Sequence, residues 1–414
     1  MDLDKLMNHP DITRRLAKAR SRLADQPFSD IIDDEGHQYV DLVMEGGGML
    51  GIALVGYTWA LEQIGIRFLG VGGTSAGSIN ALLISALDVP AAPKSPKLLK
   101  QLAEKNFFDF IDGDDDARDF IECWVQGAGK FKLAFKGAQV MDNLNERLGL
   151  NPGRTFEQWV RNILRDEGIR TLGDLEKRMN TLPKGLRTRD GKALNTPKKA
   201  GVRLAIVTAD VSTETKVVFP DMARMYFKDP AAVNPAVFVR ASMSIPYFFE
   251  PLTLKSLPQD EVAKKMWRDT GFDDASEGGM PRSALFVDGG IMSNFPIDVF
   301  HVPSGVPEAP TFGVKLEYDR RRHDIGGPFE LFGAIFNSAR HCLDYDFIHR
   351  NPDYARLVQW IPCRGYNWLD FNMSDEKKAG LFREGALSAL DFLETFDWQG
   401  YKDVRKSLSE AAKS

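Results

Sequence analysis

The residues best suited to chemistry form a Gly-x-Ser-x-Gly pattern, in which Ser75 stands between Gly73 and Gly77. The apolar run 67–71 predicts a short strand before this turn, and residues 78–87 predict a buried helix after it. A strand, a tight turn and a helix in this order present a serine as a nucleophile. We expect the glycines to let the backbone turn sharply and to leave the hydroxyl at a helix N-terminus. Ser75 is therefore the candidate nucleophile.

A glycine loop upstream predicts a second chemical group. It follows the predicted strand 39–44 and precedes an apolar helix predicted over 52–64. Consecutive glycines expose backbone N–H groups at the start of a helix, which favours the binding of an anion. Beside a serine nucleophile, such amides serve as an oxyanion hole, and the amide after the nucleophile adds to them. The expected donors are Gly47 and Gly48, then Gly46 or Met49, and Ala76.

The same loop fits a competing pattern, because Gly46, Gly48 and Gly51 satisfy the Gly-x-Gly-x-x-Gly fingerprint of dinucleotide-binding folds. That function needs an acidic residue about 20 residues on, at the end of the next strand, to bind the ribose. No Asp or Glu lies between Glu62 and Asp88. A phosphate-binding P-loop would end in Gly-Lys-Ser/Thr, which this loop lacks. An oxyanion hole is thus favoured over a nucleotide site.

A carboxylate is predicted to join these groups from a third part of the chain. The apolar run 284–287 predicts a strand that ends in Asp288. Catalytic groups in open α/β sheets collect at the carboxyl ends of strands, so Asp288 is the candidate general base. Burial beside the serine should raise its pKa towards the range in which a base works at neutral pH. Asp210 also ends a predicted strand, but a role in capping the following turn is favoured for it.

In this order, the glycine loop, the Gly-Thr-Ser-Ala-Gly turn and the Asp-Gly-Gly motif resemble the patatin-like phospholipases, a family of lipid acyl hydrolases. The resemblance covers residues 39–90 and 200–316, with a fainter match in the helix after Gly327. Leu50 departs from many members, which carry a basic residue there, and this argues against a cationic contact to a phosphate headgroup. Three further segments are similar to the family's central strand pair, its Ala-Ser-x-x-Ile-Pro segment and its DGG-x-x-x-Asn-x-Pro signature: 205–219, 239–251 and 286–296.

The resemblance implies an α/β fold, a three-layer α/β/α sandwich with a central, mostly parallel sheet. It implies a Ser75–Asp288 dyad that hydrolyses carboxylic esters of long-chain lipids through an acyl-enzyme, with neither cofactor nor metal. The substrate would be a lipid at a membrane or micelle surface, and regulation by a protein or small-molecule activator stays open. The sequence does not specify an oligomeric state. The further motif residues are Gly51, Gly73, Gly77, Gly289 and Gly290.

The histidines bear on the choice between a dyad and a Ser-Asp-His triad, whose histidine lies late in the chain on a loop. His323 lies in a run of charges and is expected in a solvated loop, whereas His341 and His349 fall on a predicted helix. The other histidines are His9, His37 and His301. A triad is therefore disfavoured. Two other classes stay open: a catalytically silent scaffold that binds membranes or proteins, and a soluble carboxylesterase or thioesterase.

Composition limits the class of protein further. With 414 residues, 43% hydrophobic and 27% charged, the chain suits one large α/β domain with additions, or two domains. A net charge of −5 gives no basic field for nucleic acid. Cys123, Cys342 and Cys363 show neither metal-ligand spacing nor a disulfide framework, which favours a reducing cytoplasm. No signal peptide or transmembrane helix is predicted, so we expect a cytoplasmic protein that is at most peripheral at a membrane.

Three parts of the chain are predicted. They are a helical extension (1–38), a catalytic domain (39–316) with an insertion at about 91–200, and a helical C-terminal part (317–414) packed on that domain. Apolar residues at helical spacing predict a core-packed helix within 10–26 and a closing helix over 374–394.

Three segments are less specific. The strict alternation of 130–136 predicts a half-buried edge strand, with a lid that meets anionic lipid as the alternative. Residues 181–200, rich in Lys, Arg, Pro and Gly, predict an exposed, mobile loop. Four large C-terminal residues are assigned to the core, with an acyl-chain pocket as the alternative: Trp360, Trp368, Phe371 and Met373.

Overall fold

The computed structural model describes most of the chain. The described residues are 2–125, 144, 146–272, 279–302, 304–317, 325–327, 331, 334–335, 337–340 and 347–411. Within these ranges, no helix combines the length and the apolar character that crossing a bilayer requires.

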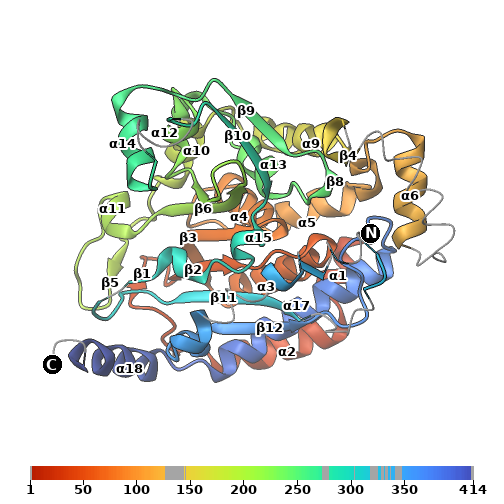
Figure 1. Cartoon of the computed structure of the whole chain (residues 1–414). Coiled ribbons are helices and arrows are strands. Elements are labelled where there is room, and N and C mark those ends of the chain that lie inside the picture. Colours follow the sequence, from red (N-terminus) through yellow and green to blue (C-terminus); the bar gives the residue numbers. More distant parts are fainter. Residues whose placement is uncertain are drawn as a thin grey trace.

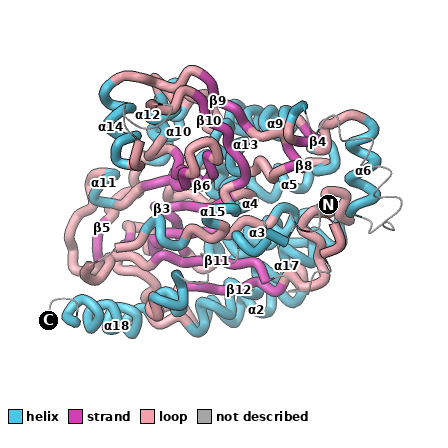
Figure 2. The backbone as a smooth tube through the Cα atoms, viewed as in Figure 1, coloured by secondary structure: helices cyan, strands magenta, loops and turns pink. Residues whose placement is uncertain are grey.

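A ten-stranded sheet runs through the centre of the described structure, with helices around it (Figures 1 and 2). Its main path has the order β12-β11-β2-β3-β6-β10-β9, and β1, β5 and β7 pair beside this path. The first five strands of the path are parallel, whereas β10 is antiparallel to β6. The predicted α/β fold with a central, mostly parallel sheet is confirmed.

The strands of this sheet are β1 (Ile31–Ile32), β2 (Gln38–Met44), β3 (Ile66–Thr74), β5 (Arg187–Thr188), β6 (Arg203–Asp210), β7 (Thr215–Phe219), β9 (Leu252–Lys255), β10 (Ser283–Asp288), β11 (Thr311–Glu317) and β12 (Val358–Pro362). A separate small sheet pairs β4 (Gly149–Asn151) with β8 (Tyr247–Phe249). The helices are α1 (Leu3–Met7), α2 (Pro10–Arg22), α3 (Gly51–Gln63), α4 (Ala76–Ala86), α5 (Ser95–Glu104), α6 (Asp115–Val125), α9 (Arg154–Asp166), α10 (Leu172–Met179), α11 (Pro197–Ala200), α12 (Ala223–Tyr226), α13 (Ala236–Ser242), α14 (Glu261–Asp269), α15 (Gly290–Ser293), α17 (Asp375–Thr395) and α18 (Trp398–Ala411). Two 3-10 segments near the site are η1 (Gly48–Leu50) and η2 (Phe107–Phe110).

The helix that follows the glycine loop, α3, is apolar on all sides because other elements enclose it. It packs on the long helix α17, where Gly56 and Gly385 each face the backbone of the partner helix. A Cβ at either position would collide with a backbone carbonyl, so only glycine permits this approach. The predicted closing helix is confirmed: α17 begins after Ser374, whose side chain accepts a hydrogen bond from the Lys377 amide.

Both ends of the chain contribute to the central sheet as well as to the helices. The core-packed helix predicted within 10–26 is confirmed, since Ile12, Leu16 and Ala19 of α2 are buried and α2 contacts α17. The description of residues 1–38 and 317–414 as helical is incomplete, because β1 and β12 lie in them and join the sheet. Both are short strands at the margin of the sheet, where the sequence pattern is weak. The boundaries of the three parts stay a prediction.

Residues 181–200 are largely irregular and exposed, as predicted, but part of the segment is anchored to the sheet. Within it, β5 pairs with β1, and Leu186 and Leu194 are buried together with Ala200. Two of its basic side chains form ion pairs, Arg187 with Asp34 at 2.8 Å and Lys192 with Glu308 at 2.5 Å. The partners come from distant parts of the chain, which composition does not reveal. The edge strand predicted at 130–136 lies outside the described residues.

Candidate active site

Ser75 lies between β3 and α4, as predicted, in a sharply turned backbone. Its φ of 51° and ψ of −120° are rare for a residue with a side chain, so the turn is strained. The expected role of the neighbouring glycines is corrected, because neither Gly73 nor Gly77 has a positive φ. They are required by close approach instead. A Cβ at Gly73 would lie 2.5 Å from the Gly77 backbone, and one at Gly77 would collide with Met44.

The end of α13 and the residues just after it hold the backbone of both predicted catalytic residues. Ser242, at the end of α13, accepts a hydrogen bond from the Ser75 amide at 2.9 Å. The Ser242 hydroxyl donates in turn to the Val207 carbonyl oxygen of β6, at 2.6 Å. Two residues on, the Ser244 carbonyl oxygen accepts a hydrogen bond from the Asp288 amide at 2.8 Å. The sequence pattern marked residues 239–251 as a family-like segment but did not indicate a role for them in the site.

Asp288 ends β10, but the direction of this strand corrects the expected reason for its position. Because β10 is antiparallel to β6, its end does not lie among the carboxyl ends of the parallel strands by direction alone. Asp288 is paired with Thr208 on one side of β6, while Thr74 is paired with Val207 on the other. The register across β6 therefore brings Asp288 level with Ser75.

The Asp288 carboxyl group is buried, with 3% of the residue exposed. Burial raises its pKa, which is the predicted direction, while the charge of Arg340 and hydrogen bonds from the Ser75 hydroxyl and the Gly290 amide oppose that rise. The Gly290 amide lies 2.7 Å from Oδ1. A Cβ at Gly289 would collide with the backbone of β6, so this glycine is required where the chain leaves β10. The Ser75 hydroxyl is thus near enough to the carboxyl group to affect its pKa.

The glycine loop has fewer open amides than expected. The Gly46 amide donates to the Asn294 carbonyl oxygen, and the Met49 amide donates to the Trp368 carbonyl oxygen, both at 2.9 Å. These two are therefore removed from the set of expected oxyanion donors, since each already has an acceptor in the protein. The expected donors whose amides have no acceptor within the described part of the chain are Gly47, Gly48 and Ala76.

A buried ion pair holds the first residue of the glycine loop in place. Glu45, which begins the loop, lies 2.9 Å from the ammonium group of Lys315, and both side chains are almost fully buried. The Glu45 carboxylate also accepts hydrogen bonds from the Leu316 amide at 2.6 Å and from the Asn294 side chain at 3.2 Å. These contacts hold the first residue of the loop against β11, so the amides that follow have a fixed direction.

Arg340 is a site residue that sequence reasoning missed. Its guanidinium group donates to the Gly46 carbonyl oxygen at 3.0 Å and to the Asn294 side-chain oxygen at 3.3 Å. It lies over the ring of Trp368 at 5.0 Å. A buried cation thus stands beside Asp288, although the loop position Leu50 supplies none. No motif marks Arg340; the only signal was the faint family match in the helix after Gly327.

An apolar cavity lies directly beside Ser75. Its wall near the serine includes Gly48 and Ala76, and the remainder is almost entirely aliphatic and aromatic. Phe371 lines this cavity, which supports the acyl-pocket alternative for that residue. Met373 is buried in the core as assigned, whereas Trp360 is 48% exposed and lies over Lys315.

The other candidate carboxylate and three of the histidines take structural positions. Asp210 accepts hydrogen bonds from the Ser212 amide at 3.0 Å and the Thr213 hydroxyl at 2.8 Å, so its predicted role in the following turn is confirmed. His9, His37 and His301 contact groups outside the site: they cap α2, bind Asp33 and bind Tyr354. His323 and His341 lie outside the described residues.

A turned serine after a parallel strand, beside a buried carboxyl group and a glycine loop, is the arrangement of a serine hydrolase on an α/β sheet. Residues 42–301 match the family model of the patatin-like phospholipases. The chain therefore belongs to the patatin-like phospholipase family, and the resemblance inferred from its motifs is confirmed. Membership of this family indicates a hydrolase that acts on lipid esters.

Comparison with individual proteins gives one relative over nearly the whole length. The chain is 32% identical over 357 residues to the uncharacterized protein YqhO of Bacillus subtilis (strain 168), an alignment that covers 84% of this chain and 95% of that protein. Among solved structures, VipD from Legionella pneumophila has a TM-score of 0.42 and 16% identity, over 89% of this chain and 70% of VipD. ExoU, in its heterodimeric complex with SpcU from the type III secretion system of Pseudomonas aeruginosa, has a TM-score of 0.34 and 18% identity, over 86% of this chain and 51% of that chain.

Proposed function

We propose that the protein is a serine lipid acyl hydrolase that uses Ser75 as the nucleophile and Asp288 as the general base. The observation that carries this proposal is the strained serine at the wall of an apolar cavity, whose hydroxyl is near enough to a buried carboxyl group to affect its pKa. A merely structural serine has no need of strain, of an adjacent base or of unpaired amides.

The reaction follows from these positions. Asp288 takes the hydroxyl proton as Ser75 Oγ bonds to the ester carbonyl carbon, and the resulting oxyanion accepts hydrogen bonds from the amides of Gly47, Gly48 and Ala76. The ester C–O bond then breaks, and the proton passes from Asp288 to the leaving alcohol. Water attacks the acyl-enzyme with Asp288 again as base. This step releases the fatty acid and returns a proton to Ser75.

Exposed apolar side chains beside the cavity support a lipid surface as the source of substrate. Tyr247 is 40% exposed and lies between Ile245 and Phe249, which both line the cavity. Leu148 is 47% exposed and precedes Gly149, the residue paired with Tyr247. Both Leu148 and Tyr247 have positive φ values, which are strained for bulky residues. We assign this pair to contact with the lipid at a membrane or micelle surface.

A fluorophosphonate probe tests the nucleophile. The wild-type protein is expected to be labelled, and Ser75→Ala is expected to lose all labelling while keeping its melting temperature. Ser85→Ala serves as the matched control, because its hydroxyl is buried within α4 and donates only to the Ala81 carbonyl oxygen. Labelling that persists in Ser75→Ala would refute the assignment of the nucleophile. Folded wild-type protein without labelling would favour a catalytically silent scaffold.

A second comparison separates a lipid hydrolase from a soluble carboxylesterase or thioesterase. Turnover of micellar phospholipid should rise above the aggregation threshold of the lipid, whereas a short-chain nitrophenyl ester has no such threshold. In the double variant Leu148→Ser with Tyr247→Ser, turnover of the micellar substrate should fall severalfold and that of the soluble ester should not. A fall in rate above the threshold in the wild type would refute lipolysis.

A further inference from the structure

The insertion between the serine turn and β6 contributes a large share of the cavity wall. Leu98 and Leu102 of α5, Phe107 and Phe110 of η2, and Phe156 and Trp159 of α9 all line it. Each of these residues lies within 91–200, outside the segments that carry the motifs of the family. The reacting groups and this part of the wall therefore come from different regions of the chain, although they share one cavity.

Four rings of the insertion pack on one another as a unit. The ring centroids of Phe110 lie 5.3 Å from Phe156, 5.4 Å from Trp159 and 5.7 Å from Phe107, with tilted or edge-to-face angles. Phe107, Phe110 and Phe156 are buried, and Trp159 is partly exposed. Such an interlocked cluster resists displacement, because moving one ring disrupts the contacts of the others. A ligand in the cavity therefore meets a fixed wall.

Two ammonium groups that do not line the cavity lie over rings of this cluster. The ammonium group of Lys105 lies 4.9 Å from the centroid of Phe110, and that of Lys378 lies 5.6 Å from the centroid of Phe107. An apolar ligand that displaced the rings would separate these ammonium groups from the ring faces, while each also has an acidic partner, Asp109 for Lys105 and Asp375 for Lys378. The cavity wall is thus apolar, and charged groups that are not part of it hold two of its rings.

From this arrangement we infer that the insertion selects the acyl chain of the substrate by length, with the four rings as the stop. The inference rests on the proposed function, because an acyl chain enters the cavity only when its ester carbonyl lies at Ser75. The occupant is a single fatty acyl chain, since the wall offers aliphatic and aromatic contacts and carries no charged side chain among its lining residues. Chains that end before the rings bury all their methylenes, and longer chains leave methylenes in water or clash.

Nitrophenyl esters of graded length test the inference: butyrate, octanoate, dodecanoate and palmitate. In Phe110→Ala and in the milder Trp159→Leu, the ratio of kcat/KM for palmitate to that for octanoate should rise at least about tenfold, since each further buried methylene contributes about fourfold. Because the ratio is taken within each variant, a general change in turnover cancels. Leu98→Phe, which fills the cavity, should lower the same ratio. Phe396→Ala removes a buried ring that packs on Phe392 instead, and it should leave the ratio unchanged.

The outcomes separate this inference from the proposed function. Folded variants that hydrolyse butyrate but keep the wild-type ratio would overturn the role of the insertion and leave the hydrolase intact. If the wild type hydrolysed none of the four esters, or if Ser75→Ala still hydrolysed them, the proposed function itself would be overturned. Thermal unfolding of each variant shows which proteins are folded, and Trp159→Leu keeps the test valid if Phe110→Ala does not fold.

Discussion

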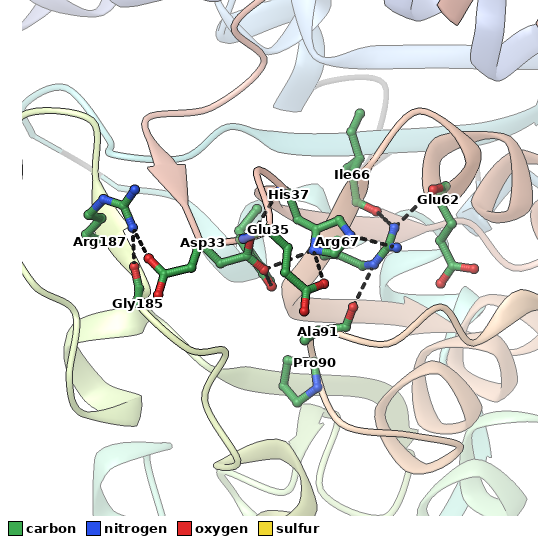
Figure 3. A network of polar contacts seen from close by, with 12 residues as sticks. Asp33, Glu35, His37, Glu62, Ile66, Arg67, Pro90, Ala91, Gly185 and Arg187 are labelled. Atoms are coloured by element: carbon green, nitrogen blue, oxygen red, sulfur yellow. Dashed lines mark hydrogen bonds and ion pairs between the residues drawn. The ribbon is translucent and has the colours of Figure 1, made fainter. Parts of the chain in front are cut away.

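Strands β2 and β3 carry a buried polar cluster at each end, and the two clusters differ in what they leave unpaired. Beyond the carboxyl ends lie Ser75, Asp288 and the glycine loop. At the amino ends, His37 precedes β2, Arg67 is the second residue of β3, and Asp33 joins them (Figure 3). Both clusters contain a buried aspartate, and the amino-end cluster even pairs it with a histidine as a catalytic triad would.

Every group named in the amino-end cluster has a partner. Asp33 Oδ2 lies 3.0 Å from His37 Nδ1 and accepts a hydrogen bond from the Tyr39 hydroxyl at 2.7 Å. The other ring nitrogen of His37 lies 3.1 Å from Arg67, whose guanidinium group also donates to the Ala91 carbonyl oxygen at 2.9 Å. The arginine thus occupies the position at which a nucleophile would stand in a triad, so this cluster is structural.

The difference appears in the two aspartates. Burial acts to raise the pKa of Asp33, but hydrogen bonds from Tyr39 and His37 outweigh it and the pKa is lowered. For Asp288 burial prevails, and the pKa is raised despite the charge of Arg340 and the hydrogen bond from Ser75. The structural cluster stabilises the charged form of its aspartate. The candidate active site instead disfavours the charged form of its base and leaves neighbouring backbone amides without an acceptor.

Replacing each aspartate by asparagine is the strongest test of whether the two clusters have different roles. Asp288→Asn should lower kcat/KM by about a hundredfold to ten-thousandfold, because the general base is lost. Its folded-state pKa is raised, so the ionised carboxylate lowers stability at pH 7, and the neutral amide should raise the melting temperature. Steady-state kinetics and thermal unfolding measure both effects. Unchanged activity would refute the role of Asp288.

Asp33→Asn should have the opposite profile. The amide NH₂ would face both the His37 ring and the Tyr39 hydroxyl, or, if the amide is flipped, the backbone amides of Glu35 and His37. The free energy of unfolding should therefore fall by about 2–3 kcal/mol, with kcat/KM unchanged within about twofold. Because the folded-state pKa of Asp33 is lowered, the wild type has this stability above the ordinary value of 3.8 and loses it as the pH falls through the folded-state value. Urea unfolding at pH 7 and at acid pH measures the difference. Equal stabilities at pH 7 would contradict this prediction.

The two clusters also show which features of the structure could be predicted from the sequence. The strands, the serine turn and Asp288 were predictable, because local periodicity and short motifs record them. The amino-end cluster and the role of Ser242 were not, because they depend on contacts between segments far apart in the chain. The antiparallel register of β10 and the engaged amides of Gly46 and Met49 were missed for the same reason: pairing partners are set by tertiary packing. Single residues such as Arg340 leave no periodic signal at all.

Replacing Arg340 tests how its charge affects the pKa of Asp288. Its charge lowers the pKa of Asp288, so Arg340→Met should raise that pKa further and reduce the ionised base at acid pH. The acid limb of the kcat/KM profile should therefore move to higher pH by about one unit. Arg340→Lys keeps the charge and should restore most of the wild-type position of the limb. A limb that stays in place in Arg340→Met would show that Arg340 only supports the Gly46 carbonyl group.

The smallest expected effect concerns the serine turn itself. Ser242→Ala removes the side-chain acceptor of the Ser75 amide and the donor to Val207, so the strained turn loses one of its supports. We expect kcat to fall about fivefold to tenfold at unchanged KM, since a hydrogen bond of this kind contributes about 1 kcal/mol and the substrate does not contact it. Ser85→Ala loses a buried hydroxyl of α4 that supports no reacting group, and its kcat should match the wild type. Equal losses in the two variants would mean that kcat follows general stability; a loss confined to Ser242→Ala would mean that it follows the geometry of the turn.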